Sequence, residues 1–235
     1  MHAENWAKHW PQYKESYIVK INSPYEEMVR AAAELPKEAN VKLFLRHAKR
    51  FDNPVNGDYS KLLLTPEGIR MAQEIGRSID RPLGHFYASS VERCRQTIRE
   101  IAHGAGVEEP NIISLEVYSG SAGAYRAQEE HHVGWYEYFY GLQRNIPEYT
   151  WGATLYGEAR PVVDAIFSDP GEEGQLDLIC SHDSHVVVLA SALFGLKTGI
   201  HGENWCGFTE GLFFAGTRED FIAYWRGEKK RFTNW

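Results

Sequence analysis

The chain has 235 residues, and its 25 Lys or Arg and 32 Asp or Glu leave a formal net charge of −7. Hydrophobic residues make up 43% and charged residues 24%, which is usual for soluble globular proteins. A chain of this length buries roughly 70% of its unfolded surface, so it needs no crosslinks to fold. These values exclude a disordered, collagen-like or disulfide-scaffold protein. The acidic balance argues against a general nucleic-acid or anionic-membrane binder.

The three cysteines, Cys94, Cys180 and Cys206, are widely spaced and match no CxxC motif. Free thiols in a reducing compartment are therefore expected. The first residues lack the basic and apolar regions of a signal peptide, and no run approaches about 18 apolar residues. We therefore expect a cytoplasmic protein that does not span a membrane.

Residues 1–40 are expected to form a leader packed on a single domain of residues 41–235. Strands and helices then alternate, which predicts a three-layer α/β/α sandwich with a mostly parallel central sheet. Residues 117–155 are rich in Gly and aromatic residues and are expected to form a cap insertion with one helix near 127–142. The predicted strands are 41–45, 85–88, 111–115 and 176–180, with a hairpin at 211–214 and 221–225. The predicted helices are 23–35, 66–79, 89–102, 156–168 and 186–194, and Asn56-Gly57 predicts a turn.

Polar side chains follow three of the predicted strands, at the sheet edge where α/β proteins bind ligands. These residues are Arg46, His47, Arg50, Arg93, His182 and Asp183. Three guanidinium groups in one cleft repel one another unless an anion lies between them, and their planar donors suit phosphate oxygens. Imidazoles beside them favour the neutral, nucleophilic form. The pattern predicts phosphoryl transfer through a phosphohistidine, with Asp183 able to protonate a leaving alkoxide.

The motifs that carry these residues resemble the histidine phosphatase superfamily. Leu45-Arg46-His47-Ala48-Lys49-Arg50 is similar to its Arg-His-Gly/Ala-x-Arg signature, although Gly is commoner than Ala at the third position. Residues 89–97 resemble its second Arg motif, and 64–68 the entry to its first long helix. Ser181-His182-Asp183 and residues 205–214 resemble the His-Asp pair and closing segment of its acid phosphatase and phytase branch. The resemblance covers about residues 41–115 and 156–226 and implies a phosphoglycerate mutase-like fold.

By this resemblance, His47 is the nucleophile, and Arg46, Arg50 and Arg93 bind the phosphoryl oxygens. His182 supports the phosphoryl group in the transition state, and Asp183 is the leaving-group acid. The chain is short for the acid phosphatase branch, whose members are usually secreted and disulfide-bonded. In the other branch the acid is a Glu that follows the strand after the second Arg motif. Glu116 lies near that place and is the alternative acid.

The resemblance implies no metal and no cofactor, because the arginines supply the positive charge that Mg²⁺ supplies in kinases. The expected partner is a small-molecule phosphate ester, with neither nucleic acid nor membrane, and a homodimer is left open. We expect a phosphatase. A mutase that returns the phosphoryl group to its substrate and a non-catalytic phospho-ligand binder are the alternatives.

Other polar residues have simpler interpretations. Arg95 lies two residues after Arg93 on the same helix, so it faces away and is expected on the surface or in a salt bridge. A metal site built from His182, Asp183 and His185 is disfavoured. Metal-dependent His-Asp hydrolases place the His-Asp pair inside a helix, whereas His182-Asp183 follows a strand and precedes a helix. His131 and His132 are expected on a solvated helix face.

Overall fold

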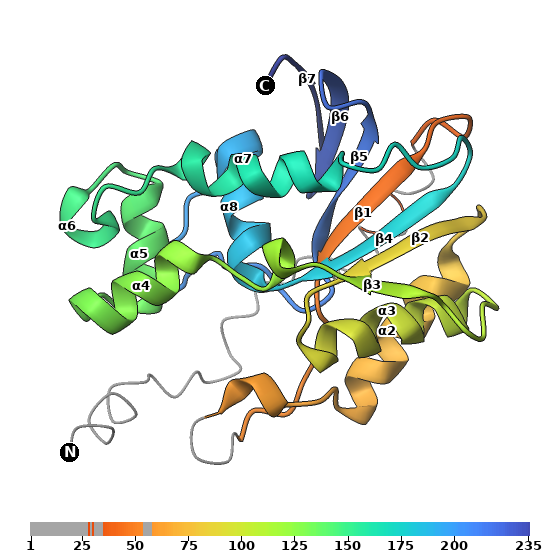
Figure 1. Cartoon of the computed structure of the whole chain (residues 1–235), viewed down its shortest axis with the longest axis horizontal. Helices are drawn as coiled ribbons and strands as arrows, with labels where there is room; N and C mark the ends of the chain where they lie inside the picture. Colours follow the sequence, from red (N-terminus) through yellow and green to blue (C-terminus); the bar gives the residue numbers. More distant parts are fainter. Residues whose placement is uncertain (1–27, 29, 31–34, 54–57) are drawn as a thin grey trace.

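The structure is a computed structural model that describes residues 28, 30, 35–53 and 58–235 (Figure 1). The predicted helix over 23–35 lies almost wholly outside the described residues, as do most of the leader and the Asn56-Gly57 turn. Within the described part, no helix is both long and apolar enough to cross a membrane.

A mixed seven-stranded sheet in the order β3-β2-β4-β1-β5-β6-β7 forms the centre of the molecule. The strands are β1 (Val41–Arg46), β2 (Leu83–Ala88), β3 (Ile112–Ser114), β4 (Leu176–Ser181), β5 (Gly211–Gly216), β6 (Asp220–Trp225) and β7 (Glu228–Thr233). The pairs from β3 to β1 are parallel, and those from β1 to β7 are antiparallel. The predicted α/β fold is confirmed, and β7 is a strand that we did not predict.

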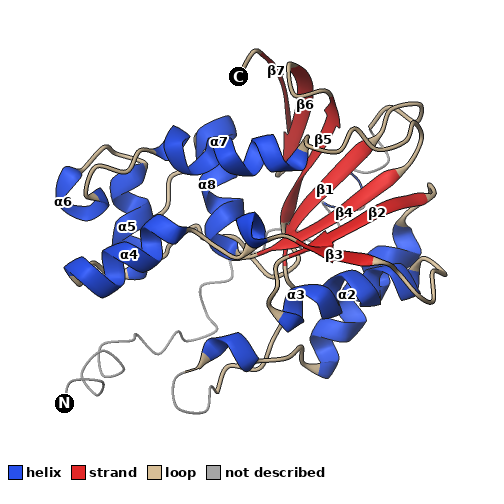
Figure 2. Ribbon diagram, viewed as in Figure 1, coloured by secondary structure: helices blue, strands red, loops and turns tan. Residues whose placement is uncertain are grey.

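Helices cover both faces of the sheet (Figure 2). One face carries α2 (Pro66–Ser78) and α3 (Glu92–Gly104), and the other carries α7 (Leu155–Ile166) and α8 (Asp183–Phe194). Side chains alternate along β1, so Leu43 and Leu45 pack in the core under α2 and α3, and Phe44 packs in the core under α8. Strands buried on both faces read as continuous apolar runs, which is why β1 and β4 were predicted well.

The helix pair α2 and α3 packs closely because two glycines meet the facing backbone. A Cβ atom at Gly76 would collide with the Ile101 carbonyl oxygen, and one at Gly104 with the Gln73 carbonyl oxygen. α2 begins at Pro66, where the Thr65 hydroxyl accepts a hydrogen bond from the Gly68 N–H at 3.0 Å. The close contact fixes α3, which carries Arg93 in its first turn.

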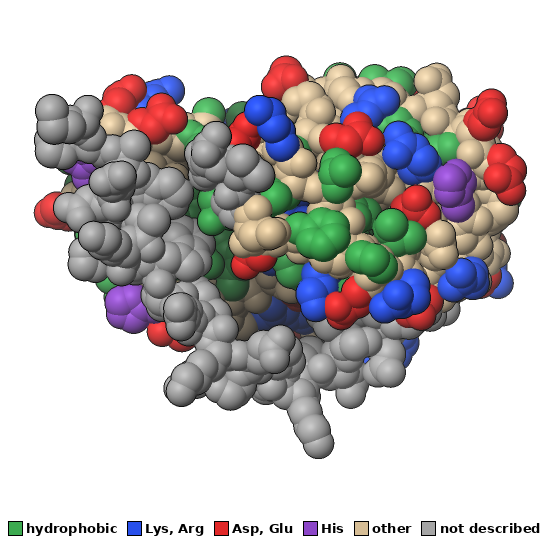
Figure 3. Space-filling view, turned by 90° about the horizontal axis from the view of Figure 1, so that it is seen from below, with side chains coloured by type: hydrophobic (Ala, Val, Ile, Leu, Met, Phe, Trp, Pro, Cys, Tyr) green, Lys and Arg blue, Asp and Glu red, His purple; other side chains and the backbone are tan. Residues whose placement is uncertain are grey.

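The cap lies between β3 and α7 and contains several short helices (Figure 1). They are η5 (Glu116–Tyr118), α4 (Ala122–His131), α5 (Trp135–Leu142) and α6 (Pro147–Thr150). Outside the cap, the short helix η4 (Tyr59–Lys61) lies between β1 and α2. The prediction of a single helix near 127–142 is wrong, because α4 and α5 are separate helices there. His132 takes a left-handed conformation with φ 57°, and Gly134 begins α5. On the face seen in Figure 3, basic and acidic side chains of the described residues are interspersed.

Candidate active site

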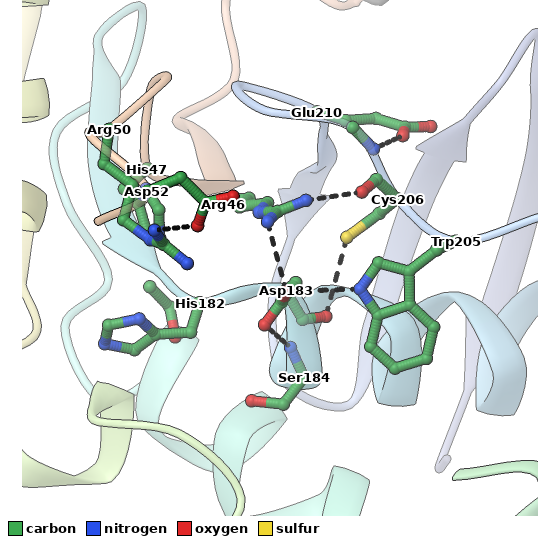
Figure 4. Close-up of polar contacts among 12 residues, drawn as sticks. Arg46, His47, Arg50, Asp52, His182, Asp183, Ser184, Trp205, Cys206 and Glu210 are labelled. Atoms are coloured by element: carbon green, nitrogen blue, oxygen red, sulfur yellow. Dashed lines mark hydrogen bonds and ion pairs between the residues drawn. The ribbon is translucent and has the colours of Figure 1, made fainter. Parts of the chain in front are cut away.

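The loops after β1, β2 and β4 bring the predicted site residues together at one edge of the sheet (Figure 4). The His47 N–H donates to the Ser181 carbonyl at 3.0 Å, which continues the β1–β4 ladder past both strand ends. His182 is the next residue after β4, and its ring centroid lies 5.6 Å from that of His47. Backbone pairing therefore holds the two imidazoles next to each other.

His47 is buried, with 3% of its surface exposed. Its Nδ1 atom lies 2.9 Å from the Ala48 carbonyl oxygen. Because a carbonyl only accepts, Nδ1 carries the proton and Nε2 keeps its lone pair. Burial, followed by the charges of Arg46 and Arg93, holds the pKa of His47 well below its usual value. The ring is thus neutral, with the Nε2 lone pair available to react.

Arg46 is held from three sides. Its Nη1 donates to the Cys206 carbonyl at 2.7 Å, and its Nη2 lies 3.2 Å from the Asp183 carboxylate. The Phe208 ring stacks against the guanidinium, whose Cζ atom lies 4.2 Å from the ring centroid. The buried Nε has no hydrogen-bond partner among the described residues.

Arg93 and His182 form a second cationic group. Arg93 donates through Nη1 to the Tyr59 carbonyl at 2.8 Å and through Nη2 to His182 Nδ1 at 3.3 Å. Since a guanidinium only donates, His182 Nδ1 accepts, and Nε2–H donates to the Ser89 hydroxyl at 3.0 Å. In the described part of the chain, the buried Arg93 Nε also has no partner. Arg46 and Arg93 both lie near enough for their charges to lower the pKa of His47.

Asp183 is the first residue of α8, and three donors surround its carboxylate. One oxygen accepts from the Ser184 N–H at 2.9 Å, and the other accepts from Trp205 Nε1 at 3.2 Å and faces Arg46. Burial raises the pKa of Asp183, but the Arg46 charge and the hydrogen bonds from Trp205 and Ser184 outweigh it, so the pKa lies below its usual value. Asp183 is therefore ionised near neutral pH.

The remaining predicted residues lie at the border of this group. Arg50 donates through Nη1 to the Phe51 carbonyl at 2.7 Å and to Asp52 at 2.8 Å, and its Cζ lies 5.1 Å from the Tyr59 ring centroid. Glu116 is exposed on η5.

A row of hydroxyl groups connects Glu116 to His182. The Ser119 hydroxyl donates to Glu116 at 3.3 Å and lies 3.4 Å from the Ser89 hydroxyl, which is the partner of His182. Glu116 is thus joined to the site through Ser119 and Ser89.

The structure adds residues to which we had assigned no role. Trp205, Cys206 and Phe208 touch Asp183 or Arg46, although their stretch stood out only as a closing motif. Ser89 was placed at a strand end, and the structure gives it His182 as a partner. No sequence signal marked these contacts, because they depend on the course of a loop.

Other residues lie outside the site. Arg95 pairs with Glu92 at 3.6 Å and donates to the Ser114 hydroxyl at 2.6 Å. His185 lies 3.0 Å from the Ser181 hydroxyl, and His131 stacks on Trp151.

A family model described as "Histidine phosphatase superfamily (branch 1)" matches residues 43–203. The chain belongs to the histidine phosphatase superfamily. The chain resembles a solved mycobacterial glucosyl-3-phosphoglycerate phosphatase with a TM-score of 0.52 and 15% identity, over 81% of this chain and 100% of that one. It also resembles a phosphoglycerate mutase from Bacillus anthracis, with a TM-score of 0.50 and 14% identity, over 84% and 94% of the two chains. At these identities the likeness establishes the fold.

The matching model is that of branch 1, whereas the His182-Asp183 pair resembles the acid phosphatase and phytase branch. The comparison with curated proteins gave no match.

Proposed function

We propose that this histidine phosphatase hydrolyses a small-molecule phosphomonoester through a covalent phosphohistidine at His47. One observation carries the proposal: a buried, neutral imidazole with a free Nε2 lies close to two guanidinium groups whose Nε atoms are unpaired among the described residues. A phosphoryl group would supply the missing acceptors and would present phosphorus to the nucleophile.

In the first step, His47 Nε2 attacks phosphorus, the N–P bond forms and the ester P–O bond breaks. The leaving oxygen takes a proton from a carboxyl group. In the second step, that carboxylate removes a proton from water, the hydroxide attacks phosphorus, and the N–P bond breaks to release inorganic phosphate. Arg46, Arg50, Arg93 and His182 hold the negative charge that develops on the phosphoryl oxygens.

Asp183 and Glu116 are the two candidates for the carboxyl group. Asp183 adjoins Arg46 directly, but its lowered pKa leaves little of the protonated form near neutral pH. Glu116 has a neutral hydroxyl donor and a hydroxyl relay to His182, and branch 1 membership supports a Glu at this place. We therefore propose Glu116 as the proton donor, with Asp183 as the alternative.

The nucleophile is tested by incubating the full chain with a ³²P-labelled aryl phosphate in excess chelator. We expect acid-labile, base-stable label on His47, release of inorganic phosphate, and loss of both in His47→Ala. His103→Ala, at the far end of α3, is the matched control and should keep both. Labelled His47→Ala would contradict the proposal, and label that stays on wild-type His47 without release of inorganic phosphate to water would indicate a mutase.

The acid is tested by comparing Glu116→Gln and Asp183→Asn on esters whose leaving groups differ in pKa. Removal of the proton donor slows esters of basic alcohols far more than esters of acidic phenols, which leave without a proton. At pH 7 we expect this pattern for Glu116→Gln. The same pattern for Asp183→Asn alone would assign the role to Asp183.

A further inference from the structure

The loop of residues 203–210, here called the closing loop, supplies three of the contacts that orient the site. The Cys206 carbonyl accepts from Arg46, and Trp205 Nε1 donates to Asp183 (Figure 4). The Phe208 ring stacks on Arg46. The loop lacks regular secondary structure, and backbone hydrogen bonds hold its two ends: the Gly199 N–H donates to the Glu203 carbonyl, and residues 209 and 210 bond to the backbone of His47 and Arg46. Side-chain contacts hold the residues between these ends.

Arg226 is the side chain that holds the closing loop. It lies in the turn between β6 and β7, with φ 44°. Its Nε donates to Glu210 at 2.6 Å, at one end of the loop. Its Nη1 donates to the Asn204 side chain at 2.7 Å, and its Nη2 to the Trp205 carbonyl at 3.2 Å, near the other end.

Glu210 completes this arrangement from inside the loop. It is 6% exposed, and its second oxygen accepts from the Gly207 N–H at 2.6 Å. One buried carboxylate thus joins the middle of the closing loop to the Arg226 guanidinium. Only the forked, planar donors of Arg fit three acceptors at once, because the Lys ammonium is a point charge on a flexible stem.

We infer that Arg226, acting with Glu210, is a positioning residue for phosphoryl transfer. It contacts neither His47 nor a phosphoryl-binding side chain, but it holds the loop that orients Arg46 and Asp183. The inference rests on the proposed function of His47. The consequence is that a residue on the β6–β7 turn sets the rate of a reaction at the β1 and β4 ends.

The experiment compares Arg226→Ala, Arg226→Lys and Glu210→Gln in the full chain, with aryl phosphate as substrate. Ala tolerates the left-handed backbone no worse than Arg, so the comparison isolates the side chain. We expect about a 10- to 100-fold loss in kcat/KM for Arg226→Ala, because misplacing binding groups by about 1 Å costs as much as 100-fold. Arg226→Lys should recover part of the loss. Arg231→Ala removes the Arg231–Asp220 ion pair from the same hairpin and should leave kcat/KM unchanged.

A double-mutant cycle with Phe208→Ala separates positioning from general destabilisation. If Arg226 acts through the loop, the double variant should lose much less than the product of the two single losses. A double variant whose loss equals the product of the two single losses would overturn the inference, as would full activity in Arg226→Ala. Neither result would contradict the proposed phosphatase function. If the wild-type chain shows no turnover, the proposed function fails. The inference is then decided by the affinity for inorganic phosphate, which Arg226→Ala must weaken and Arg231→Ala must not.

Discussion

The Asp183 carboxylate lies 3.2 Å from the guanidinium of Arg46, the residue that directly precedes His47, the proposed nucleophile. A phosphoryl group at His47 would require donors from this same guanidinium. Asp183 and a bound anion therefore compete for Arg46 and repel each other. The carboxylate that keeps Arg46 in place in the free protein also opposes the binding of phosphate.

This competition predicts that Asp183→Asn binds inorganic phosphate more tightly than the wild-type chain. The amide keeps the shape and an acceptor for Trp205 but removes the negative charge beside Arg46. We expect roughly a 3- to 10-fold lower Kd, as for loss of one like charge near a partly exposed site. Isothermal calorimetry at pH 7 measures it, with Asp164→Asn as the control, because Asp164 is exposed and pairs with Arg218, a residue outside the site. Weaker binding by Asp183→Asn would contradict the competition.

Buried His185 predicts that stability falls in acid. Burial lowers the pKa of His185 to about 3, from 6.5 in the unfolded chain. Below pH 6.5 the unfolded state therefore takes up a proton that the folded state refuses until about pH 3, so stability is lost as the pH falls through this range. Between pH 7 and 5 the loss is about 2 kcal/mol for this group.

Urea unfolding at the two pH values measures this loss. His185→Asn removes the titrating group, so its stability should fall less between pH 7 and 5 than that of the wild-type chain. His132→Asn is the matched control, because His132 is exposed and its left-handed backbone suits Asn. An equal pH dependence in His185→Asn and the wild type would contradict the assignment.

The buried ion pair between Lys42 and Asp177 predicts a large, one-sided stability effect. The two residues face each other across β1 and β4 at 2.9 Å, and both are nearly inaccessible. Asp177→Asn keeps an acceptor for the His85 N–H but leaves the Lys42 charge unpaired. We expect a loss of about 3–5 kcal/mol in the free energy of unfolding.

The double variant Lys42→Met/Asp177→Asn removes both charges and should recover much of that loss. Guanidinium-induced unfolding measures the three proteins. The pair lies near the starts of its strands, at the opposite end from His47, so the folded variants should keep their phosphate affinity. A double variant less stable than Asp177→Asn would show that the pair itself is the larger source of stability.

The close contact of α2 and α3 predicts that Gly76→Ala is destabilising. The added methyl group would meet the Ile101 carbonyl oxygen, and backbone atoms cannot move aside as a flexible side chain can. Overpacking of this kind costs about 1–3 kcal/mol. Gly157→Ala, at an exposed place in the first turn of α7, is the matched control: its Cβ would meet the Thr154 side-chain hydroxyl instead of backbone, so it should cost less than Gly76→Ala. Thermal unfolding of the two variants gives the comparison.

The elements that the sequence predicted best are the ones buried on both faces. β1 and β4 are mainly apolar, interrupted only by the paired Lys42 and Asp177 before their polar ends, and α2 has Thr65 and Pro66 at its start, so pattern and local chemistry agree. β7 was missed because it is an exposed edge strand with the sequence Glu-Lys-Lys-Arg-Phe-Thr, in which no apolar alternation marks a strand. The break between α4 and α5 was missed because His132 adopts a conformation that His rarely takes.

The site was predictable as far as it depends on strand ends. Arg46, His47 and His182 follow strands that pair directly, so their convergence follows from the topology. The topology does not predict which acceptor each donor group in the site bonds to. That Arg93 bonds to His182, and that Trp205 lowers the pKa of Asp183, depend on rotamers and on a loop without regular structure.

The central place of β1 in the sheet has a consequence for the order in which the protein assembles. Its neighbours on either side begin at Leu176 and Gly211, so β1 has no strand partner until most of the chain has been synthesised. Arg46 and His47 receive their backbone partners, the Glu210 and Ser181 carbonyls, from those same late segments. Long-range pairing of this kind slows folding. A nascent chain thus carries Arg46 and His47 long before it can position them, and their surroundings are complete only once residues 176–211 have been synthesised.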